Sequence, residues 1–190
     1  MKKLRVTGAP GFLGSEVVRV AVKQGYEVRA LRRSTSSLDR MQGLPVTWVT
    51  GDVTQPVSVA EAMAGVEYCI HAAGDTSYYL ADVARQRAVN VEGTRNVVET
   101  ARRAKVRRLI HVSSVAAIGF DPAGGAVDET ACWNWPAGLP YMETKRDGEA
   151  LALAAAVPGF DVVALNPATI FGPGKMNASE ERLVAEIREG

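Results

Sequence analysis

Short apolar runs alternate along the chain with longer segments in which apolar residues recur at helical spacing. The short runs have the length of β-strands and are apolar at consecutive positions rather than at every second one. Such runs are typical of strands buried on both faces of a parallel sheet. The pattern predicts six strands, at residues 4–7, 27–31, 46–50, 68–73, 108–114 and 161–167.

The longer segments between these runs predict helices. The first helix follows a cluster of glycines and ends near Gly25, a residue type that commonly terminates helices. Strands that alternate with helices build a doubly wound α/β sheet, which carries helices on both of its faces. We therefore expect a Rossmann-type fold of the α/β class, with helices at residues 13–24, 83–104, 141–157 and 179–189.

One long segment, residues 118–140, fits neither pattern. It is rich in Pro and Gly and contains Trp133 and Trp135. Long irregular segments in compact domains are commonly functional loops. We interpret this one as a loop over the site. Its two tryptophans either cover a substrate or pack the loop, and both interpretations stay open.

Composition and charge narrow the class of partner. A chain that is 47% apolar and 23% charged is an ordinary globular protein, and a net charge of +1 indicates neither a nucleic-acid nor a membrane-surface partner. The opening MKKLRVTG lacks the apolar stretch of a signal peptide, and the longest apolar run, residues 150–157, is too short for a bilayer. Cys69 and Cys132 form no metal or disulfide motif. We expect a cytoplasmic protein without a metal site.

The first candidate site is the stretch TGAPGFLG, which joins the first strand to the first helix. It places Gly8, Gly11 and Gly14 at intervals of three residues. Glycines in this turn let the backbone approach a pyrophosphate closely, and the helix N-terminus offers free N–H groups to it. Pro10 lies inside the turn and removes one N–H donor. The position predicts a dinucleotide site, and the alternative is an ordinary strand-to-helix turn.

The second strand ends in Arg32 and Arg33, followed by STSS. A carboxylate at this point would bind the ribose 2′-hydroxyl of NAD, whereas an arginine suits the 2′-phosphate of NADP. The alternative is a pair of solvated arginines. Since the acid is absent and the base is present, the sequence favours NADP, with NAD as the other possibility.

Candidate catalytic residues follow later in the chain. YMETK places Tyr141 and Lys145 four residues apart, on one face of the predicted helix. A nearby lysine lowers the pKa of a phenol, so the tyrosine becomes a usable acid–base. Ser113 and Ser114 end the fifth strand, at the same sheet edge as the glycine turn, where a hydroxyl could hold a substrate oxygen. The alternatives are a solvated helix pair and an ordinary loop.

In this order, the motifs resemble those of the extended short-chain dehydrogenase/reductase family. TGAPGFLG is similar to its TGxxGFxG cofactor turn, GDVT to its adenine segment, and HAAG to the fourth-strand segment beside the cofactor. NVEGTRNV resembles its Asn-x-x-Gly-Thr helix, and NPATIFGPG the segment against the nicotinamide. SSVAAIG with YMETK resembles its Ser–Tyr–Lys triad, and the spacing to Gly119 places the serine on Ser114.

The resemblance implies a catalytic set of Ser114, Tyr141 and Lys145. It also implies that a set of turn, strand-end and helix residues binds NADP or NAD. This cofactor set comprises Gly8, Gly11, Phe12, Leu13, Gly14, Arg32, Arg33, Asp52, Val53, Ala72, Ala73, Gly74, Asn90, Thr94 and Pro167.

Within the family, EVRALRRSTSSL, NVEGTRNVVE and VDET resemble the dihydroflavonol-4-reductase-like proteins and the related epimerase/dehydratase proteins. In those reductases Arg33 aligns with the arginine that meets the 2′-phosphate, and Arg32 takes the place of the NAD-type acid. The implied activity is hydride transfer to a carbonyl, or from an alcohol, of a small molecule. Tyr141 would supply the proton, Ser114 would polarise the oxygen, and Lys145 would hold the nicotinamide ribose.

Two other functions are weighed against this one. A nucleotide-sugar epimerase with bound NAD is the second candidate, and Arg32 and Arg33 argue against it. A dinucleotide-binding regulator without turnover is the third, and the presence of Tyr141 and Lys145 argues against it. A sugar dehydratase would need an acidic pair near the serine, which SSVAA lacks.

Family members continue beyond the length of this chain into a further strand and a small substrate domain. We expect residues 1–190 to form one NAD(P)-binding Rossmann domain, either truncated or degenerate, and the substrate domain to be missing. A homodimer is left open. Among the remaining polar residues, His111 is interpreted as a core histidine and His71 as part of the cofactor pocket, while Gly148 allows close helix packing.

Overall fold

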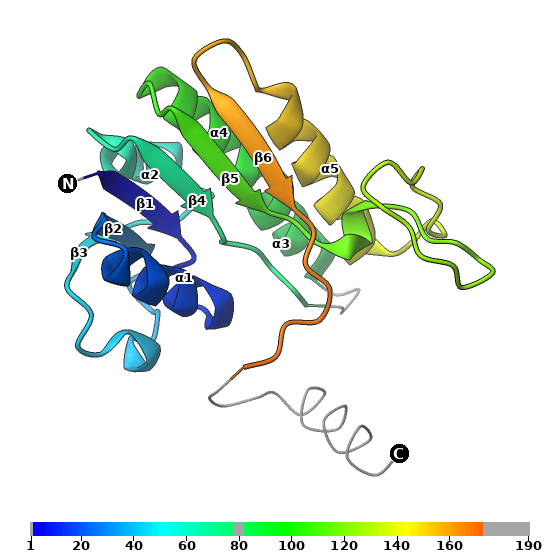
Figure 1. Cartoon of the computed structure of the whole chain (residues 1–190), viewed down its shortest axis with the longest axis horizontal. Coiled ribbons are helices and arrows are strands. Elements are labelled where there is room, and N and C mark those ends of the chain that lie inside the picture. The colour runs from blue at the N-terminus through cyan, green and yellow to red at the C-terminus, as the bar shows by residue number, and fades with distance from the viewer. Residues whose placement is uncertain (1, 78–81, 173–190) are drawn as a thin grey trace.

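A computed structural model describes residues 2–77 and 82–172 (Figure 1). Its centre is a parallel sheet of six strands in the order β3-β2-β1-β4-β5-β6. The predicted fold class, a doubly wound α/β sheet of Rossmann type, is therefore confirmed. The strands are β1 (Lys3–Thr7), β2 (Glu27–Arg32), β3 (Val46–Thr50), β4 (Tyr68–His71), β5 (Arg108–Val112) and β6 (Asp161–Leu165).

Helices cover both faces of the sheet. On one face α1 packs over β1 and β2, and on the other α2, α4 and α5 pack over the rest (Figure 1). Each face has its own apolar core, one around Val6, Val18 and Val28, the other around Met63, Val97 and Leu109. The helices are α1 (Phe12–Lys23), α2 (Pro56–Met63), α3 (Val83–Arg87), α4 (Thr94–Arg103) and α5 (Pro140–Ala154), with short 3₁₀ turns at Asp39–Met41 and Val115–Ala117.

Three of the predicted strands extend too far. β4, β5 and β6 end at His71, Val112 and Leu165, because the residues after them leave the sheet and form loops at its carboxyl edge. The helix predicted at 83–104 is present as α3, a π-helical segment at Ala88–Gly93 and α4 in succession. The helix predicted at 179–189, like Tyr78 and Tyr79, lies outside the described residues.

Helix α2 was missed by the sequence pattern because it is only eight residues long and has no charged outer face in its first turn. Its start is marked by Pro56 at the first helical position, which is a usable signal. It buries Val59, Ala62 and Met63 against the sheet. Within the described ranges, none of the helices has the length and hydropathy needed to cross a bilayer.

Arg5, in the middle of β1, is the largest fully buried side chain. Among the described residues, its three guanidinium nitrogens have no hydrogen-bond partner. Burial lowers the pKa of Arg5 to about 10, with Cys69 opposing and Arg29 adding to the effect, so the group is still charged at neutral pH. A charged group without a partner in an apolar layer is destabilising.

We therefore expect Arg5→Leu to raise the free energy of unfolding by about 1–3 kcal/mol, because an apolar side chain removes the cost of burying the charge. Urea denaturation measures this change. Arg107→Leu is the control, since Arg107 is exposed, and it should change stability by less than about 0.5 kcal/mol. A loss of stability in Arg5→Leu would show that the guanidinium has a partner that compensates for its burial.

Candidate functional site

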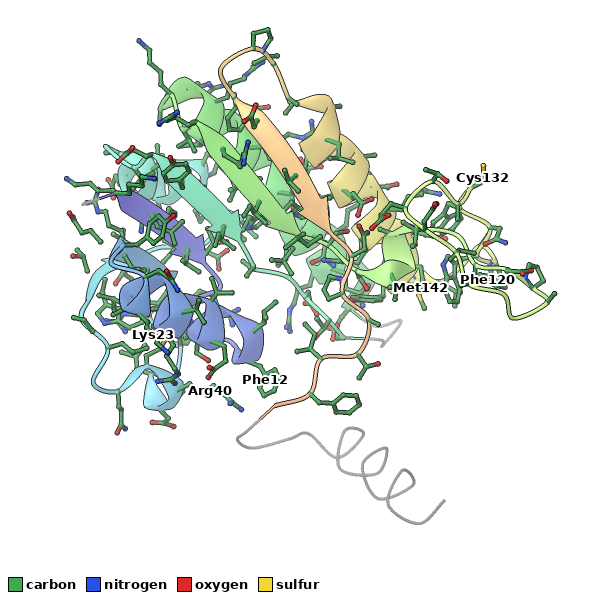
Figure 2. The ribbon with its side chains drawn as sticks, viewed as in Figure 1. Phe12, Lys23, Arg40, Phe120, Cys132 and Met142 are labelled. Carbon is green, nitrogen blue, oxygen red and sulfur yellow. The ribbon has the colours of Figure 1, made fainter. Side chains whose placement is uncertain are left out.

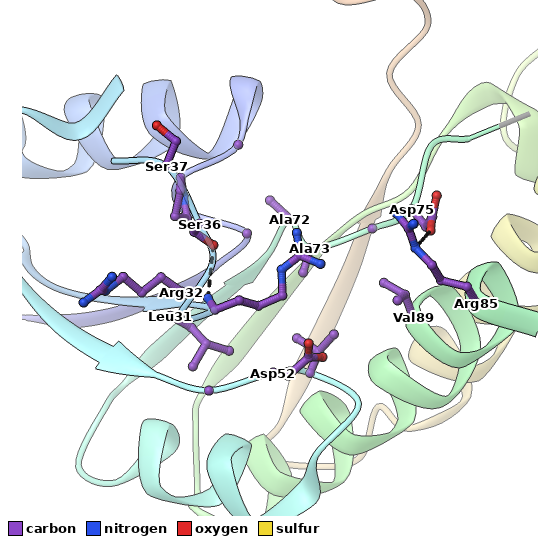
Figure 3. A pocket seen from close by; sticks show the side chains of 17 residues that line it. Leu31, Arg32, Ser36, Ser37, Asp52, Ala72, Ala73, Asp75, Arg85 and Val89 are labelled. Carbon is purple, nitrogen blue, oxygen red and sulfur yellow. Dashed lines mark hydrogen bonds and ion pairs between the residues drawn. The ribbon is translucent and has the colours of Figure 1, made fainter. Parts of the chain in front are cut away.

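A cleft of about 340 Å³ opens at the carboxyl ends of β1, β2 and β4 (Figure 3). After β1 the chain runs to β2 on one side, and β4 lies on the other side of β1, so the strand order reverses here. Doubly wound folds bind ligands at such a switch point. The cleft is lined by Gly8, Pro10, Gly11, Leu31, Arg32, Arg33, Ser36, Ser37, Gly51, Asp52, Val53, Ala72, Ala73, Gly74, Asp75, Arg85 and Val89.

The glycine turn forms one wall of the cleft. Gly8 has a φ of +67°, and a Cβ atom there would lie 2.6 Å from the backbone of Ala72 and Ala73. A Cβ atom at Gly14 would overlap the Gly8 carbonyl oxygen, to which Gly11 N donates at 3.0 Å. Both glycines are therefore required by the close approach of α1, the turn and the end of β4.

Helix α1 begins directly after this turn, and its N-cap, Gly11, offers no side chain to the free N–H groups. Gly11 N is already used inside the turn, so the N–H groups of Phe12, Leu13 and Gly14 are the ones available to an anion. The Phe12 ring faces Arg40 instead, whose guanidinium carbon lies 4.9 Å from the ring centre (Figure 2). Phe12 can therefore serve an anion only through its backbone.

The two arginines after β2 lie differently. Arg32 is paired with Thr50 in the sheet register, and its guanidinium lies 5.7 Å from the ring of Trp48, two residues back along β3. Its side chain thus runs back over the sheet, away from the cleft (Figure 3). Arg33 is exposed and lines the cleft, in a turn closed by hydrogen bonds of 3.1 Å from Arg33 N to Ser36 Oγ and from Ser36 N to the Arg33 carbonyl.

Asp52 and Val53 line the cleft beside the end of β2. Asp52 Oδ1 accepts hydrogen bonds from the backbone N and hydroxyl of Thr54, at 2.9 and 2.8 Å. Asp52 N donates to Ser58 Oγ at 3.0 Å. The segment is therefore held in one conformation by its own side chains.

Ala72, Ala73 and Gly74 form the opposite wall, and a chain of buried hydrogen bonds holds them. Thr94 Oγ1 donates to the Asn90 carbonyl at 2.7 Å and so accepts from His71 Nε2 at 3.1 Å. This network assigns the ring proton to Nε2. His71 Nδ1 therefore accepts from Thr7 Oγ1 at 2.7 Å, and Thr7 Oγ1 accepts from Ala73 N at 3.3 Å.

Asn90, in the π-helical segment, lies behind the cleft wall rather than in it. Its side chain accepts from Asp75 N at 2.8 Å and donates to the Asp75 carbonyl at 3.0 Å. It also donates to Thr144 Oγ1 on α5, at 3.2 Å. Asn90 and Thr94, both predicted as cofactor residues, thus act here as supports of the segment that lines the cleft.

The three predicted catalytic residues are all nearly buried, at 9% exposure for Ser114, 8% for Tyr141 and 8% for Lys145. Ser114 follows β5 at the carboxyl edge of the sheet, and its hydroxyl accepts from Ala116 N at 3.2 Å. Tyr141 and Lys145 lie one turn apart on α5, which packs against the 3₁₀ turn after Ser114. The fold thus brings two distant segments of the sequence to one edge.

Lys145 donates from Nζ to the Val112 carbonyl at 3.1 Å. Burial lowers its pKa to about 8, against a smaller opposing effect of Glu149. Burial also lowers the pKa of His71 to about 3, with a contribution from Lys145, and that of His111 to about 2, with contributions from His71 and Lys145. The two imidazole rings lie 5.3 Å apart, and His111 is buried as expected.

The segment after β6 anchors the serine loop. Asn166 donates to the Ser114 carbonyl at 3.0 Å and to Glu149 at 2.6 Å. The carbonyl of Pro167 accepts from Val115 N at 3.1 Å. Pro167, predicted to bind the cofactor, is not among the residues that line the described cleft, and its carbonyl holds the loop that follows Ser114.

Two further predictions about packing can be read from the structure. A Cβ atom at Gly148 would overlap the Asn90 carbonyl oxygen, so this glycine does permit close packing of α5. Trp133 and Trp135 donate to the carbonyls of Ala116 and Ile118, at 3.3 and 2.9 Å. Both tryptophans therefore pack the irregular loop onto the segment after Ser114.

Several lining residues were not predicted. Leu31 and Val89 are marked only by neighbouring motif residues, whereas Gly51 is the first residue of the GDVT motif. Asp75 directly follows HAAG, which is a usable signal, whereas nothing in the sequence points to Arg85. No group of three or more His, Cys, Asp or Glu that could hold a metal ion is found in residues 2–77 and 82–172.

One prediction from this site concerns the contact at Gly8. Gly8→Ala and Gly25→Ala both place an alanine at positive φ, but only Gly8 has backbone atoms where the Cβ would go. We expect Gly25→Ala to cost about 1 kcal/mol of unfolding free energy. Gly8→Ala should cost at least about 2 kcal/mol more and remove nucleotide binding, as measured by urea denaturation and calorimetry. Equal losses in the two variants would contradict the steric argument.

Another prediction from this site concerns the buried histidines, which are the only two in the chain. Between pH 6.5 and about pH 3 the unfolded chain binds protons at these residues that the folded chain does not, so stability falls as the pH drops. From pH 7.5 to pH 5 each histidine should cost about 2 kcal/mol.

Urea denaturation at the two pH values tests this. His111→Phe should reduce the loss between pH 7.5 and pH 5 by about 2 kcal/mol, and His111→Asn serves as a second variant if the first folds poorly. An unchanged pH dependence in both variants would show that His111 titrates normally in the folded chain.

Known proteins resemble this chain over most of its length. Residues 4–189 match the model of the NAD dependent epimerase/dehydratase family. The chain is 39% identical over 168 residues to sterol demethylase protein B of Methylococcus capsulatus, covering 88% of this chain and 51% of that protein. It is 39% identical over 171 residues to a Synechocystis sp. protein provisionally named dihydroflavonol 4-reductase, covering 88% and 49%.

A solved structure gives the same result. A short-chain dehydrogenase/reductase superfamily protein from Agrobacterium tumefaciens, with bound NAD, superposes with a TM-score of 0.70 at 31% identity, covering 86% of this chain and 48% of that one. The chain thus spans about half the length of the relatives that it matches.

Proposed function

Because this chain belongs to the NAD dependent epimerase/dehydratase family, we propose that it is the cofactor-binding and catalytic part of an NADP-dependent oxidoreductase. The reaction is reduction of a carbonyl, or oxidation of an alcohol, of a small molecule. The observation that carries the proposal is the placement of Ser114, Tyr141 and Lys145 at the same sheet edge as the cleft.

The residues of the cleft fit a dinucleotide. The turn at Gly8 leaves no room for a side chain, and α1 presents uncapped N–H groups to it, which suits a pyrophosphate. Asp52 and Val53, beside Leu31 and Val89, offer a mainly apolar slot for a nucleobase. The turn, the end of β2 and the slot at Val53 and Val89 would therefore hold the pyrophosphate, the adenosine ribose and the base.

The end of β2 supports NADP over NAD. Arg32 occupies the place of an acid, and its side chain is held back against Trp48. Its Nε atom is buried without a partner among the described residues. Arg33 lines the cleft next to Ser36 and Ser37, and a cation flanked by hydroxyls suits a 2′-phosphate.

The chain's own groups can handle the proton and the substrate oxygen. Tyr141 donates its phenolic proton to the carbonyl oxygen in the reductive direction and takes it back in the oxidative one. Ser114 donates a hydrogen bond to the same oxygen as negative charge develops there. Lys145, fixed by the Val112 carbonyl, supplies a positive charge on the face of α5 that carries Tyr141. The bound nicotinamide supplies or accepts the hydride.

The nucleotide-sugar epimerase remains the second candidate because the family's own description includes epimerases. It requires NAD that stays bound through the cycle, and the arginines after β2 argue against it. The regulator without turnover is disfavoured by the near-complete burial of Tyr141 and Lys145 together at the sheet edge.

The test is carried out on the protein as it is encoded in full. It should oxidise NADPH in the presence of a ketone or aldehyde from a broad panel and bind NADPH more tightly than NADH. Tyr141→Phe should lower kcat by about 100-fold or more, because it removes the hydroxyl group that would donate the proton. It should leave the Kd of NADPH within about threefold, because the aromatic ring is kept. Tyr68→Phe, at the far end of β4, is the control and should change neither.

Three results would overturn parts of the proposal. Full turnover in Tyr141→Phe would exclude it as the acid. Tighter binding of NADH would exclude the NADP assignment. Interconversion of nucleotide sugars without net consumption of NADPH would establish the epimerase instead.

A further inference from the structure

Arg85 stands on the rim of the cleft, on α3, across from the end of β2 (Figure 3). Its Nε atom lies 2.7 Å from Asp75 Oδ2, and its side chain is 62% exposed whereas that of Asp75 is 3% exposed. The guanidinium is therefore ion-paired with Asp75 through Nε while much of its side chain stays exposed at the cleft.

The anchor is unusually well fixed. Asp75 Oδ1 accepts from the backbone N and the hydroxyl of Ser77, at 3.0 and 2.7 Å. Asn90 binds both backbone groups of Asp75. These hydrogen bonds hold the carboxylate in one orientation, and the ion pair with Asp75 in turn positions Arg85.

Stability alone does not account for this arrangement. An ion pair whose cation is mostly exposed adds little to stability, and taking a carboxylate out of water is costly. Desolvation raises the pKa of Asp75, but the hydrogen bonds of Ser77 and the charge of Arg85 outweigh it and lower that pKa, so the carboxylate stays charged. The arrangement thereby holds a planar cation at the cleft.

The other residues that line the cleft indicate which part of a ligand this cation would contact. Val89 lies one helical turn after Arg85, and Leu31, Val53 and Ala72 line the same cleft. An apolar slot with a guanidinium at its rim suits a flat aromatic base, because a cation is attracted to the face of a π-system.

We propose that Arg85 binds the adenine ring of the dinucleotide and that Asp75 is the residue that positions it. The inference rests on the proposed function in one respect only, namely that this cleft holds the adenosine part of the cofactor. Under this proposal Asn90 acts on the cleft indirectly, because Asn90 holds Asp75 and Asp75 pairs with Arg85.

The test measures binding of 5′-AMP and of 2′,5′-ADP to the 190-residue chain by calorimetry, without any substrate. Arg85→Met should weaken both nucleotides by about three- to fivefold and leave the ratio of their affinities unchanged. Arg33→Met should lower that ratio. Arg87→Met, in the same helix but paired with Asp147, is the control and should change neither.

The role of Asp75 is tested by a double-mutant cycle. Asp75→Asn should weaken 5′-AMP as much as Arg85→Met does, and the double variant should bind no more weakly than either. Arg85→Lys should be intermediate, because it keeps the charge and loses the planar group.

Several outcomes overturn the inference. Unchanged 5′-AMP binding in Arg85→Met excludes the contact, and a further loss when Asp75→Asn is added to it excludes the positioning role. A loss seen with 2′,5′-ADP but not with 5′-AMP places Arg85 at the 2′-phosphate instead. A wild-type chain that binds both nucleotides equally contradicts the NADP assignment alone, and one that binds neither overturns both proposals.

Discussion

The contact between Gly8 and the backbone of Ala72 and Ala73 is the constraint on which the site depends. It fixes how closely the turn after β1 approaches the end of β4 at the point where the strand order reverses. Any side chain at Gly8 would force these two segments apart. The cleft exists because β1 and β4 diverge just beyond this contact, one toward α1 and the other toward α3. The glycine turn thus sets how closely the chain after β1 packs against the end of β4, in addition to leaving N–H groups free for an anion.

From this contact a series of buried hydrogen bonds leads to α5, the helix that carries Tyr141 and Lys145. Thr7 binds Ala73 and His71, and His71 binds Thr94. The next link is Asn90, which holds Asp75 on one side and Thr144 of α5 on the other. Gly148 brings α5 close enough for that link, since a methyl group there would overlap the Asn90 carbonyl. This series of hydrogen bonds requires a neutral His71, because Nδ1 accepts from Thr7 while Nε2 donates to Thr94.

Much of this could be predicted from the sequence, because glycines, strand-end residues and the Tyr–Lys spacing are local signals. Periodicity was sufficient for the six strands, and it failed for α2, whose eight residues are too few to show a helical period. The limits of β4, β5 and β6 were also overestimated, since apolar residues such as Ala73 continue past the last residue of the strand. The supporting roles of Asn90 and Pro167 could not be predicted, because motif position does not say whether a side chain faces the cleft or the layer behind it. Arg85 was missed because its importance comes from a partner ten residues away across a loop.

The distribution of charge explains how a nearly neutral chain can receive an anionic cofactor. The net charge of +1 gives no long-range attraction, so the field must be local. Arg33 and Arg85 line the cleft from opposite sides, and the start of α1 adds its own positive end. Around the predicted catalytic residues the opposite holds, since burial keeps both histidines neutral and leaves Lys145 as the cation on the helix that carries Tyr141. A positive charge on His71 or His111 would repel that of Lys145. The fold therefore separates the cationic lining of the cleft from the region around Lys145, where burial keeps both histidines neutral.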